Sequence, residues 1–214
     1  MAEPLRLIAL TGRAGAGKDS VAATLVRHRN YQTIAFADAL RAEISAAWRI
    51  DPRMLQDPAT KEWAIPALAV GNCGDPGFSA LHRPYGLCEP RSPRWIMQRW
   101  GDYQKALRGE GYYAHIVLRW LRRQVASGWT RLLVTDLRFA VEHHTLRLAS
   151  DHLRVVRVHR PGLLPGLVDA GTAQHASERE QLFISNDVDL VNDGSMEDLV
   201  HEVLLMEGGL YADQ

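Results

Sequence analysis

The chain has 214 residues, 46% of them hydrophobic, and its 25 basic and 25 acidic residues leave no formal net charge. This length suits one compact domain, with or without an insertion. The balanced charge argues against a general electrostatic attraction to nucleic acid, and no run of 18 apolar residues is present to span a membrane. The N-terminus lacks a signal peptide, and we interpret Cys73 and Cys88 as free thiols, so we expect a cytoplasmic protein.

The first predicted element is a buried strand over 5–11, and a glycine-rich turn follows it directly. The turn has the Gly-x-x-x-x-Gly-Lys spacing of a phosphate-binding loop, and a helix is predicted over 17–29. Backbone N–H groups of such a loop surround a polyphosphate. Lys18, one of three lysines beside 22 arginines, would reach the outer phosphates. The residues predicted to bind the phosphates of ATP or GTP are Gly12, Arg13, Ala14, Gly15, Ala16, Gly17, Lys18, Asp19 and Ser20.

The segment after the second predicted strand, 32–36, is a candidate acceptor site. In a kinase of small phosphorylated molecules the acceptor lies here, so Asp38 would meet a sugar hydroxyl or a base and Arg41 an acceptor phosphate. The alternative is that Asp38 caps the helix predicted to begin there and that Arg41 is a surface residue.

A second candidate acceptor segment lies in the middle of the chain. Helical pieces broken by prolines are predicted over 51–70, a long loop over 71–93, and helices over 93–108 and 112–126. Arg94 and Gln98 share a face of the first of these helices, where they suit an acceptor phosphate and a base edge. Trp95 and Trp100 either stack on a base or belong to the core.

A strand predicted over 131–136 ends in Asp136, where a phosphate-binding-loop enzyme needs a carboxylate for Mg²⁺. The predicted metal ligands are therefore Asp19, Ser20 and Asp136, directly or through water. Arg138 would neutralise charge on the transferring phosphoryl group, and Glu142, on the helix predicted over 139–150, would orient it. The alternative is that Asp136 caps this helix and that Arg138 pairs with Glu142 on the surface.

The last third of the chain predicts a strand over 153–159, a flap over 160–175, a strand over 187–192 and a helix over 195–206, capped by Ser195. Basic residues flank the flap, among them Arg157, His159 and Arg160. They suit a lid that closes over ATP and excludes water, although an ordinary surface loop would carry similar charges.

Alternating strands and helices predict an α/β fold, a P-loop NTPase fold with a mostly parallel sheet flanked by helices. We expect a single kinase domain with a core at about 1–44 and 128–214, a helical acceptor-binding part at about 45–127 and a lid at about 160–176. The strand order is not predicted.

Six motifs in a fixed order resemble those of bacteriophage deoxynucleoside monophosphate kinases and, more distantly, phosphomevalonate kinases. The resemblance covers nearly the whole chain. One departure is Gly101-Asp102-Tyr103, where relatives often carry Gly-Thr. The motifs are Gly17-Lys18-Asp19-Ser20, Phe36-Ala37-Asp38-x-Leu40-Arg41, Pro93-Arg94-x-x-x-Gln98-x-x-Gly101, Thr135-Asp136-Leu137-Arg138-Phe139-x-x-Glu142, His175-x-Ser177-Glu178, and Val188-Asp189 followed by Asp193-Gly194.

The resemblance implies an ATP- and Mg²⁺-dependent kinase that converts a deoxynucleoside 5′-monophosphate to the diphosphate. It implies small-molecule nucleotide substrates and a phage-encoded protein acting in the host cytoplasm; no membrane partner is expected from the composition, and a homodimer is left open. Asp19 is the family's usual variant, and Ser177 and Glu178 match the segment after the lid. Catalysis is assigned to Lys18, Asp136, Arg138 and Arg160, and acceptor binding to Phe36, Asp38, Arg41, Arg94, Gln98 and Glu142.

Two other functions stay open from the sequence. One is a P-loop kinase of another acceptor, either a phosphomevalonate-like molecule or a modified base in phage DNA; the DNA reading predicts a basic face, which the neutral charge disfavours. The other is a nucleotide-binding regulator without catalysis, against which the intact Lys18, Asp136 and Arg138 argue.

Overall fold

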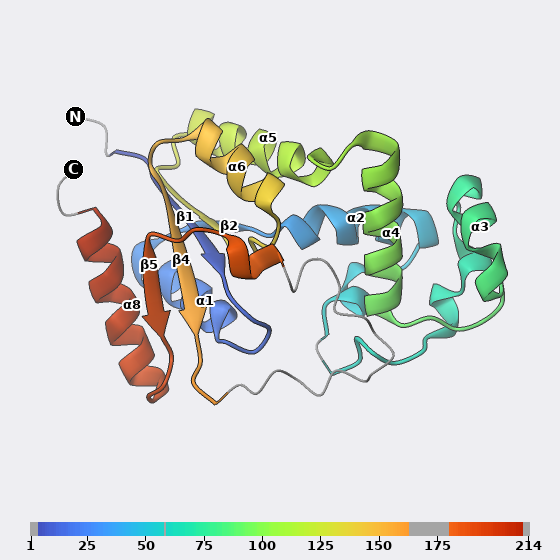
Figure 1. Ribbon diagram of the computed structural model, residues 1–214, viewed down its shortest axis with the longest axis horizontal. Coiled ribbons are helices and arrows are strands. Elements are labelled where there is room, and N and C mark those ends of the chain that lie inside the picture. Colours follow the sequence, from blue (N-terminus) through green and yellow to red (C-terminus); the bar gives the residue numbers. More distant parts are fainter. Residues whose placement is uncertain (1–3, 58, 163–179, 212–214) are drawn as a thin grey trace. The chain divides into compact units, whose positions relative to one another are not determined.

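The computed structural model describes residues 4–57, 59–162 and 180–211 (Figure 1). The chain forms two compact units. Unit 1 combines Met1–Phe36 with Ala114–Gln214, and unit 2 is Ala37–Tyr113. Each unit is described by itself below. In the described ranges no helix is long and apolar enough to cross a membrane.

Unit 1 is built on one parallel sheet, as the alternation of strands and helices predicts. In the described part of the chain the sheet has five strands in the order β2-β3-β1-β4-β5, and every neighbouring pair is parallel. The carboxyl ends of all these strands therefore meet at one edge, where ligands bind in open α/β sheets. The strands are β1 (Arg6–Thr11), β2 (Gln32–Ile34), β3 (Arg131–Val134), β4 (Leu153–His159) and β5 (Val188–Val191).

Helices cover both faces of this sheet (Figure 1). On one face, strand residues such as Ile8 and Val156 join the apolar residues of α1 (Lys18–Arg29) and α8 (Met196–Leu210) in a single core cluster. Alternate strand residues point the other way. Leu7 and Val155 are just as buried on the opposite face, over which α5 (Tyr112–Ala126) and α6 (Ala140–Ala149) lie.

The start of α2 (Phe36–Trp48) shows where tertiary contact overrides local sequence signals. The sequence predicts the second strand through residue 36 and a helix beginning at Asp38, but β2 ends at Ile34 and the helix begins at Phe36. An Asp136 oxygen accepts the Phe36 backbone N–H at 2.6 Å and fixes that start. Asp136 thus caps α2, a different helix from the one predicted, whose N-cap is Phe139.

Unit 2 packs around aromatic side chains. Trp48 and Trp100 approach Phe78 with ring centroids 5.3 and 5.2 Å away, and the Trp48 indole donates to the Ala69 carbonyl at 3.0 Å. Trp100 is therefore a core residue. The further elements of unit 2 are η1 (Pro52–Leu55), η2 (Pro66–Leu68), η3 (Val70–Asn72), α3 (Pro76–His82), η4 (Arg83–Tyr85) and α4 (Pro93–Arg108), where η is a 3₁₀ helix.

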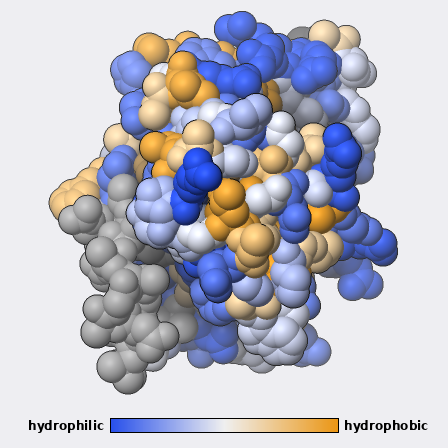
Figure 2. Space-filling view, turned by 90° about the vertical axis from the view of Figure 1, so that its right-hand side faces the viewer, coloured by the Kyte–Doolittle hydropathy of each residue, from blue (hydrophilic) through white to orange (hydrophobic). Residues whose placement is uncertain are grey.

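The predicted long loop over 71–93 is wrong in part, because it contains α3 and two 3₁₀ helices. Asp75 caps α3 by accepting the Phe78 N–H at 2.9 Å, and Pro76 occupies the first helical position. By contrast, the helix predicted at 93–108 is confirmed with its Ser92 cap. On the face shown in Figure 2, hydrophobic and hydrophilic side chains are interspersed.

Candidate active site

The glycine-rich turn joins β1 to α1 at the carboxyl edge of the sheet. Gly12, Gly15 and Gly17 have φ angles of +132°, +79° and +103°, in the region that glycine adopts readily and other residues avoid. The intervening Arg13 and Ala14 are exposed. The turn therefore needs glycine at these positions for its own backbone conformation, and this explains the glycines of the sequence motif.

Two neighbouring segments press against this loop. A Cβ atom on Gly12 would lie 2.3 Å from the Val158 carbonyl oxygen of β4. A Cβ atom on Gly17 would lie 2.3 Å from the side-chain amide nitrogen of Asn192, which follows β5. The ends of β4 and β5 thus hold the first and last glycines of the motif in close contact.

Lys18 brings a positive charge back over the loop. Its ammonium donates to the carbonyls of Gly12 and Arg13, at 2.6 and 2.9 Å. The ammonium, the N-terminus of α1 and the glycine-shaped backbone together form a site for a polyphosphate. The residues present therefore fit the phosphates of a nucleoside triphosphate.

Asp136 lies just beyond β3, which pairs directly with β1. Its position at the carboxyl edge of the sheet, beside the strand that leads into the loop, is the one expected for a magnesium-binding carboxylate. Within the described residues no group of three or more His, Cys, Asp or Glu side chains is arranged to hold a metal. Mg²⁺ in nucleotide sites needs only one or two carboxylates besides phosphates and water, so a single strand-end carboxylate such as Asp136 is compatible with it.

The turn after β3 is fixed by a buried carboxylate. Glu142 is only 4% exposed, and one of its oxygens accepts the backbone N–H groups of Arg138 and Phe139, both at 3.0 Å. Glu142 is thus no surface residue, and its observed contact positions the backbone from which the Arg138 side chain emerges.

A hollow of about 240 Å³ adjoins the loop within unit 1. Arg157 in its wall is held by Asn186 and by the Gln181 carbonyl, at 3.1 and 3.0 Å, so its guanidinium is a structural tie. Arg160 is exposed on the same wall. The rest of the predicted lid, 163–176, and also Ser177 and Glu178, lie outside the described residues. The hollow is lined by Gly12, Arg13, Ala16, Arg157, Val158, His159, Arg160 and Gln181.

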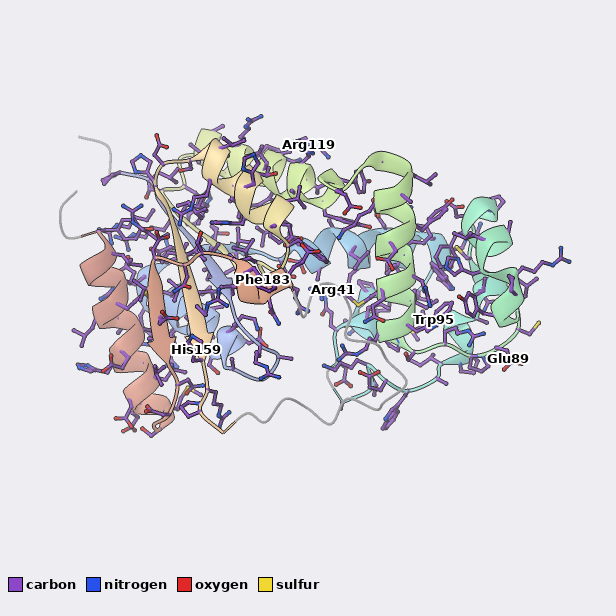
Figure 3. All side chains as sticks on the ribbon, viewed as in Figure 1. Arg41, Glu89, Trp95, Arg119, His159 and Phe183 are labelled. Carbon is purple, nitrogen blue, oxygen red and sulfur yellow. The ribbon has the colours of Figure 1, made fainter. Side chains whose placement is uncertain are left out.

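The predicted acceptor residues, apart from Phe36 and Glu142, belong to unit 2. On α2, Arg41 donates to Asp38 at 2.7 Å, and on α4, Arg94 pairs with Glu62 (Figure 3 labels Arg41). Gly101 shares the α4 face that carries Arg94 and Gln98, and a Cβ atom on it would lie 3.8 Å from Leu40, the neighbour of Arg41. Adjoining helices therefore carry the two predicted segments. Phe36 itself is buried at the start of α2.

Asn192 is a contact to the loop that sequence reasoning missed. The sequence shows it only as part of the turn after the last strand, and the partner it reaches is 176 positions away. The one available signal was the fixed order of the motifs, which puts the Val188-Asp189 and Asp193-Gly194 elements around it.

The sheet and the loop after its first strand define a P-loop NTPase fold. No protein-family model matches the sequence, and no curated protein sequence matches it either.

Solved structures do match the chain. The dephospho-CoA kinase from Campylobacter jejuni is 12% identical, with a TM-score of 0.52 over 97% of this chain and 98% of that one, and this likeness shows the shared fold. Shikimate kinase from Aquifex aeolicus is 14% identical, with a TM-score of 0.46 over 97% and 99% of the two chains. A sugar kinase from Janibacter is also 14% identical, with a TM-score of 0.45 over 94% of each chain.

Proposed function

We propose that the protein transfers the γ-phosphoryl group of ATP to a deoxynucleoside 5′-monophosphate, in a reaction that depends on Mg²⁺. The observation that carries this proposal is the placement of Lys18 over a glycine-shaped loop, with Asp136 after the adjacent strand of the same sheet. The fold shared with a dephospho-CoA kinase supports phosphoryl transfer to a small molecule. The ordered motifs support the nucleotide acceptor.

The donor side of the reaction lies in unit 1. Backbone N–H groups of the loop bind the β- and γ-phosphates, and the Lys18 ammonium leaves the carbonyls of Gly12 and Arg13 to bind the more strongly charged phosphates. Asp136, with Asp19 or Ser20, would hold Mg²⁺ directly or through water, and the bound ion would neutralise charge on the phosphates.

The transfer itself needs positioning and charge neutralisation more than acid–base chemistry. An oxygen of the acceptor phosphate, already an anion, forms a bond to the γ-phosphorus while the bond to the leaving oxygen of ADP breaks in line with it. No general base is required. Lys18, Arg138 and Arg160 supply the positive charge that offsets the charge spread over the transferring group.

The acceptor side is assigned to unit 2 from its charges. Arg41 and Arg94 carry guanidinium groups suited to bidentate contact with an acceptor phosphate, each now paired with the single carboxylate of Asp38 or Glu62. Gln98 and Asp38 can hydrogen-bond a base edge or a sugar hydroxyl. A dianionic phosphate competes well for such half-exposed ion pairs, because exposed pairs contribute little stability.

The test is a panel of acceptors. The protein is incubated with Mg-ATP and each ribo- and deoxynucleoside monophosphate in turn, and ADP formation is measured with and without a chelator of Mg²⁺. We expect at least one deoxynucleotide to accelerate ADP formation, and the chelator to abolish it. Binding of ATP without ADP formation for any nucleotide would remove the proposed function and favour a non-catalytic nucleotide-binding protein.

A further inference from the structure

Asn192 ties the carboxyl end of β5 to the phosphate-binding loop. Its backbone N–H donates to the His159 carbonyl at 2.7 Å, which extends the pairing of β4 and β5 by one residue. Its side-chain amide donates to the Ala16 carbonyl at 3.0 Å. The side chain is half-buried, whereas the next residue, Asp193, is exposed. A fixed strand end therefore aims one amide donor at one peptide of the loop.

That hydrogen bond determines which way the peptide between Ala16 and Gly17 faces. In a planar trans peptide the carbonyl and the following N–H point in opposite directions. Because the Ala16 carbonyl points at Asn192, the Gly17 N–H points away from Asn192. A phosphate bound by the loop takes its hydrogen bonds from N–H groups turned in this way, so the orientation of this peptide is a condition for binding.

The same side chain adds a second reason for glycine at position 17, besides the positive φ angle. With φ at +103° and the Asn192 nitrogen 2.3 Å from where a Cβ atom would stand, any larger residue is both strained and obstructed. At Gly12 the equivalent obstacle is the backbone carbonyl of Val158. Gly12 is thus held by a backbone carbonyl, whereas Gly17 is held by a side chain that mutation can replace.

We infer that Asn192 is a positioning residue of the phosphate-binding loop, which acts by holding the Ala16–Gly17 peptide with its N–H toward the bound triphosphate. This inference rests on the proposed function for the identity of the ligand. In this role Asn192 acts through the loop and does not contact the substrate.

Replacing Asn192 should weaken phosphate binding while the protein stays folded. Without the amide the peptide is free to turn, and one hydrogen bond of the loop is lost. We expect Asn192→Ala to weaken binding of Mg-ATP and of inorganic tripolyphosphate by roughly five- to tenfold. Asn192→Asp should bind more weakly still, because a carboxylate cannot donate to the Ala16 carbonyl and adds negative charge beside the phosphates.

Asn72→Ala is the matched control. The Asn72 amide also donates to backbone carbonyls, those of Pro66 and Ala67 at 3.1 and 3.3 Å, but it lies in unit 2. The Asn72→Ala substitution removes hydrogen bonds of the same kind that do not involve the phosphate-binding loop. The affinity of this variant for Mg-ATP and tripolyphosphate should therefore match that of the wild type.

The experiment measures dissociation constants by titration calorimetry and folding by circular dichroism, together with KM values for ATP and for the acceptor. A positioning role predicts a higher KM for ATP, an unchanged KM for the acceptor, and folded variants. Asn192→Ser, which keeps a shorter donor, replaces Asn192→Ala if the latter does not fold, and it should also bind tripolyphosphate more weakly than the wild type.

Two results would contradict the positioning role of Asn192, and they can be told apart. If the wild type binds both ligands and the folded Asn192 variants bind them within twofold as tightly, the positioning role is wrong while the proposed function stands. If the wild type binds neither ligand, the proposed function fails, and the inference fails with it.

Discussion

The two units of this molecule reach a stable core by different means. Unit 1 packs aliphatic residues of a parallel sheet, such as Ile8, Leu133 and Val156, against two helices. The described residues of unit 2 form α-helices and 3₁₀ helices without a strand of the sheet, and their core centres on Trp48, Phe78 and Trp100. These three rings lie on α2, α3 and α4, and the short 3₁₀ helices η1, η2 and η3 add Leu55, Leu68 and Val70 to the same cluster, so large aromatic side chains bury the apolar surface around which all of these elements pack.

This difference affects how easily the proposed site residues of each unit can be found in the sequence. In unit 1 the residues proposed to bind phosphate are consecutive, because a loop after a strand presents its own backbone to a ligand. In unit 2 the proposed acceptor residues are spread over two helices that are distant in sequence and adjoin through Leu40 and Gly101. The proposed donor site is thus a local property of the sequence, whereas the proposed acceptor site depends on how two helices of unit 2 pack together.

Removing Lys18 should have the largest effect on activity. Lys18→Ala deletes the ammonium that lies over the loop and should lower the rate of phosphoryl transfer by about 10³-fold or more, with the fold intact. Arg119→Ala, which deletes an exposed cation on α5, is the control and should leave the rate unchanged. Near-normal turnover of the folded Lys18 variant would show that the loop is not the donor site.

Opening the aromatic core of unit 2 should give the largest loss of stability. Phe78 is fully buried, so Phe78→Ala should lower the free energy of unfolding by about 3–5 kcal/mol. Leu81→Ala on the same helix removes a side chain that is 60% exposed and should change it by less than about 0.5 kcal/mol. Urea denaturation measures both, and equal effects would contradict the aromatic core.

Glycine-to-alanine substitutions can separate two costs to stability, backbone strain at a positive φ angle and overlap of the added Cβ atom with a neighbour. Gly128 has φ at +89° and no atom within 4 Å of an added Cβ, so Gly128→Ala should cost about 1 kcal/mol from strain alone. Gly12→Ala adds an overlap with the Val158 carbonyl and should cost about 3 kcal/mol. Gly17→Ala should be partly rescued by Asn192→Ala, whereas Gly12→Ala should not be.

The outcome of this series is read from thermal unfolding of the single and double variants. Equal costs at positions 12, 17 and 128 would mean that β4 and β5 do not press on the loop.

A smaller contribution to the free energy of unfolding comes from the Tyr31 hydroxyl in unit 1, and alkaline pH should reveal it. Burial, with Tyr211 and the Glu207 carboxylate nearby, raises the pKa of Tyr31, whose hydroxyl donates to Glu207 at 3.0 Å. A folded pKa above the unfolded value gives stability that is complete below about pH 10 and is lost as the pH rises further. Tyr31→Phe should cost about 1–2 kcal/mol at neutral pH and make the alkaline decline less steep.

Tyr85→Phe, which alters a phenol that is 48% exposed, should leave that decline unchanged. Unfolding free energies measured from pH 8 to pH 11 distinguish the two variants, and an identical decline in both would exclude Tyr31 as its source.

Most of the architecture followed from local patterns in the sequence. The strand at 153–159 and the helix at 93–108 have the predicted bounds, because apolar runs and the Ser92-Pro93 cap are local signals. The strand order was not predictable, since it depends on pairing between segments far apart. The helix α3 was missed because its proline and glycine resemble a loop, while burial of Phe78 stabilises it as a helix.

The candidate site divides in the same way. The loop and Lys18 lie where the motif places them, because seven consecutive residues specify the turn. The partner of Asp136 was not predictable, since the Phe36 N–H that it accepts is 100 positions away. Glu142 was predicted to orient Arg138 and does bond to that residue's backbone, but its burial has no local signature.

The most direct test of the central claim follows both products of the transfer. Phosphorus NMR of the wild type with Mg-ATP and the deoxynucleoside monophosphates should show ADP and a deoxynucleoside diphosphate appearing in equal amounts, with no signal growth in Lys18→Ala. ADP appearing with inorganic phosphate instead, or no change in the wild type under conditions where it binds ATP, would contradict the account.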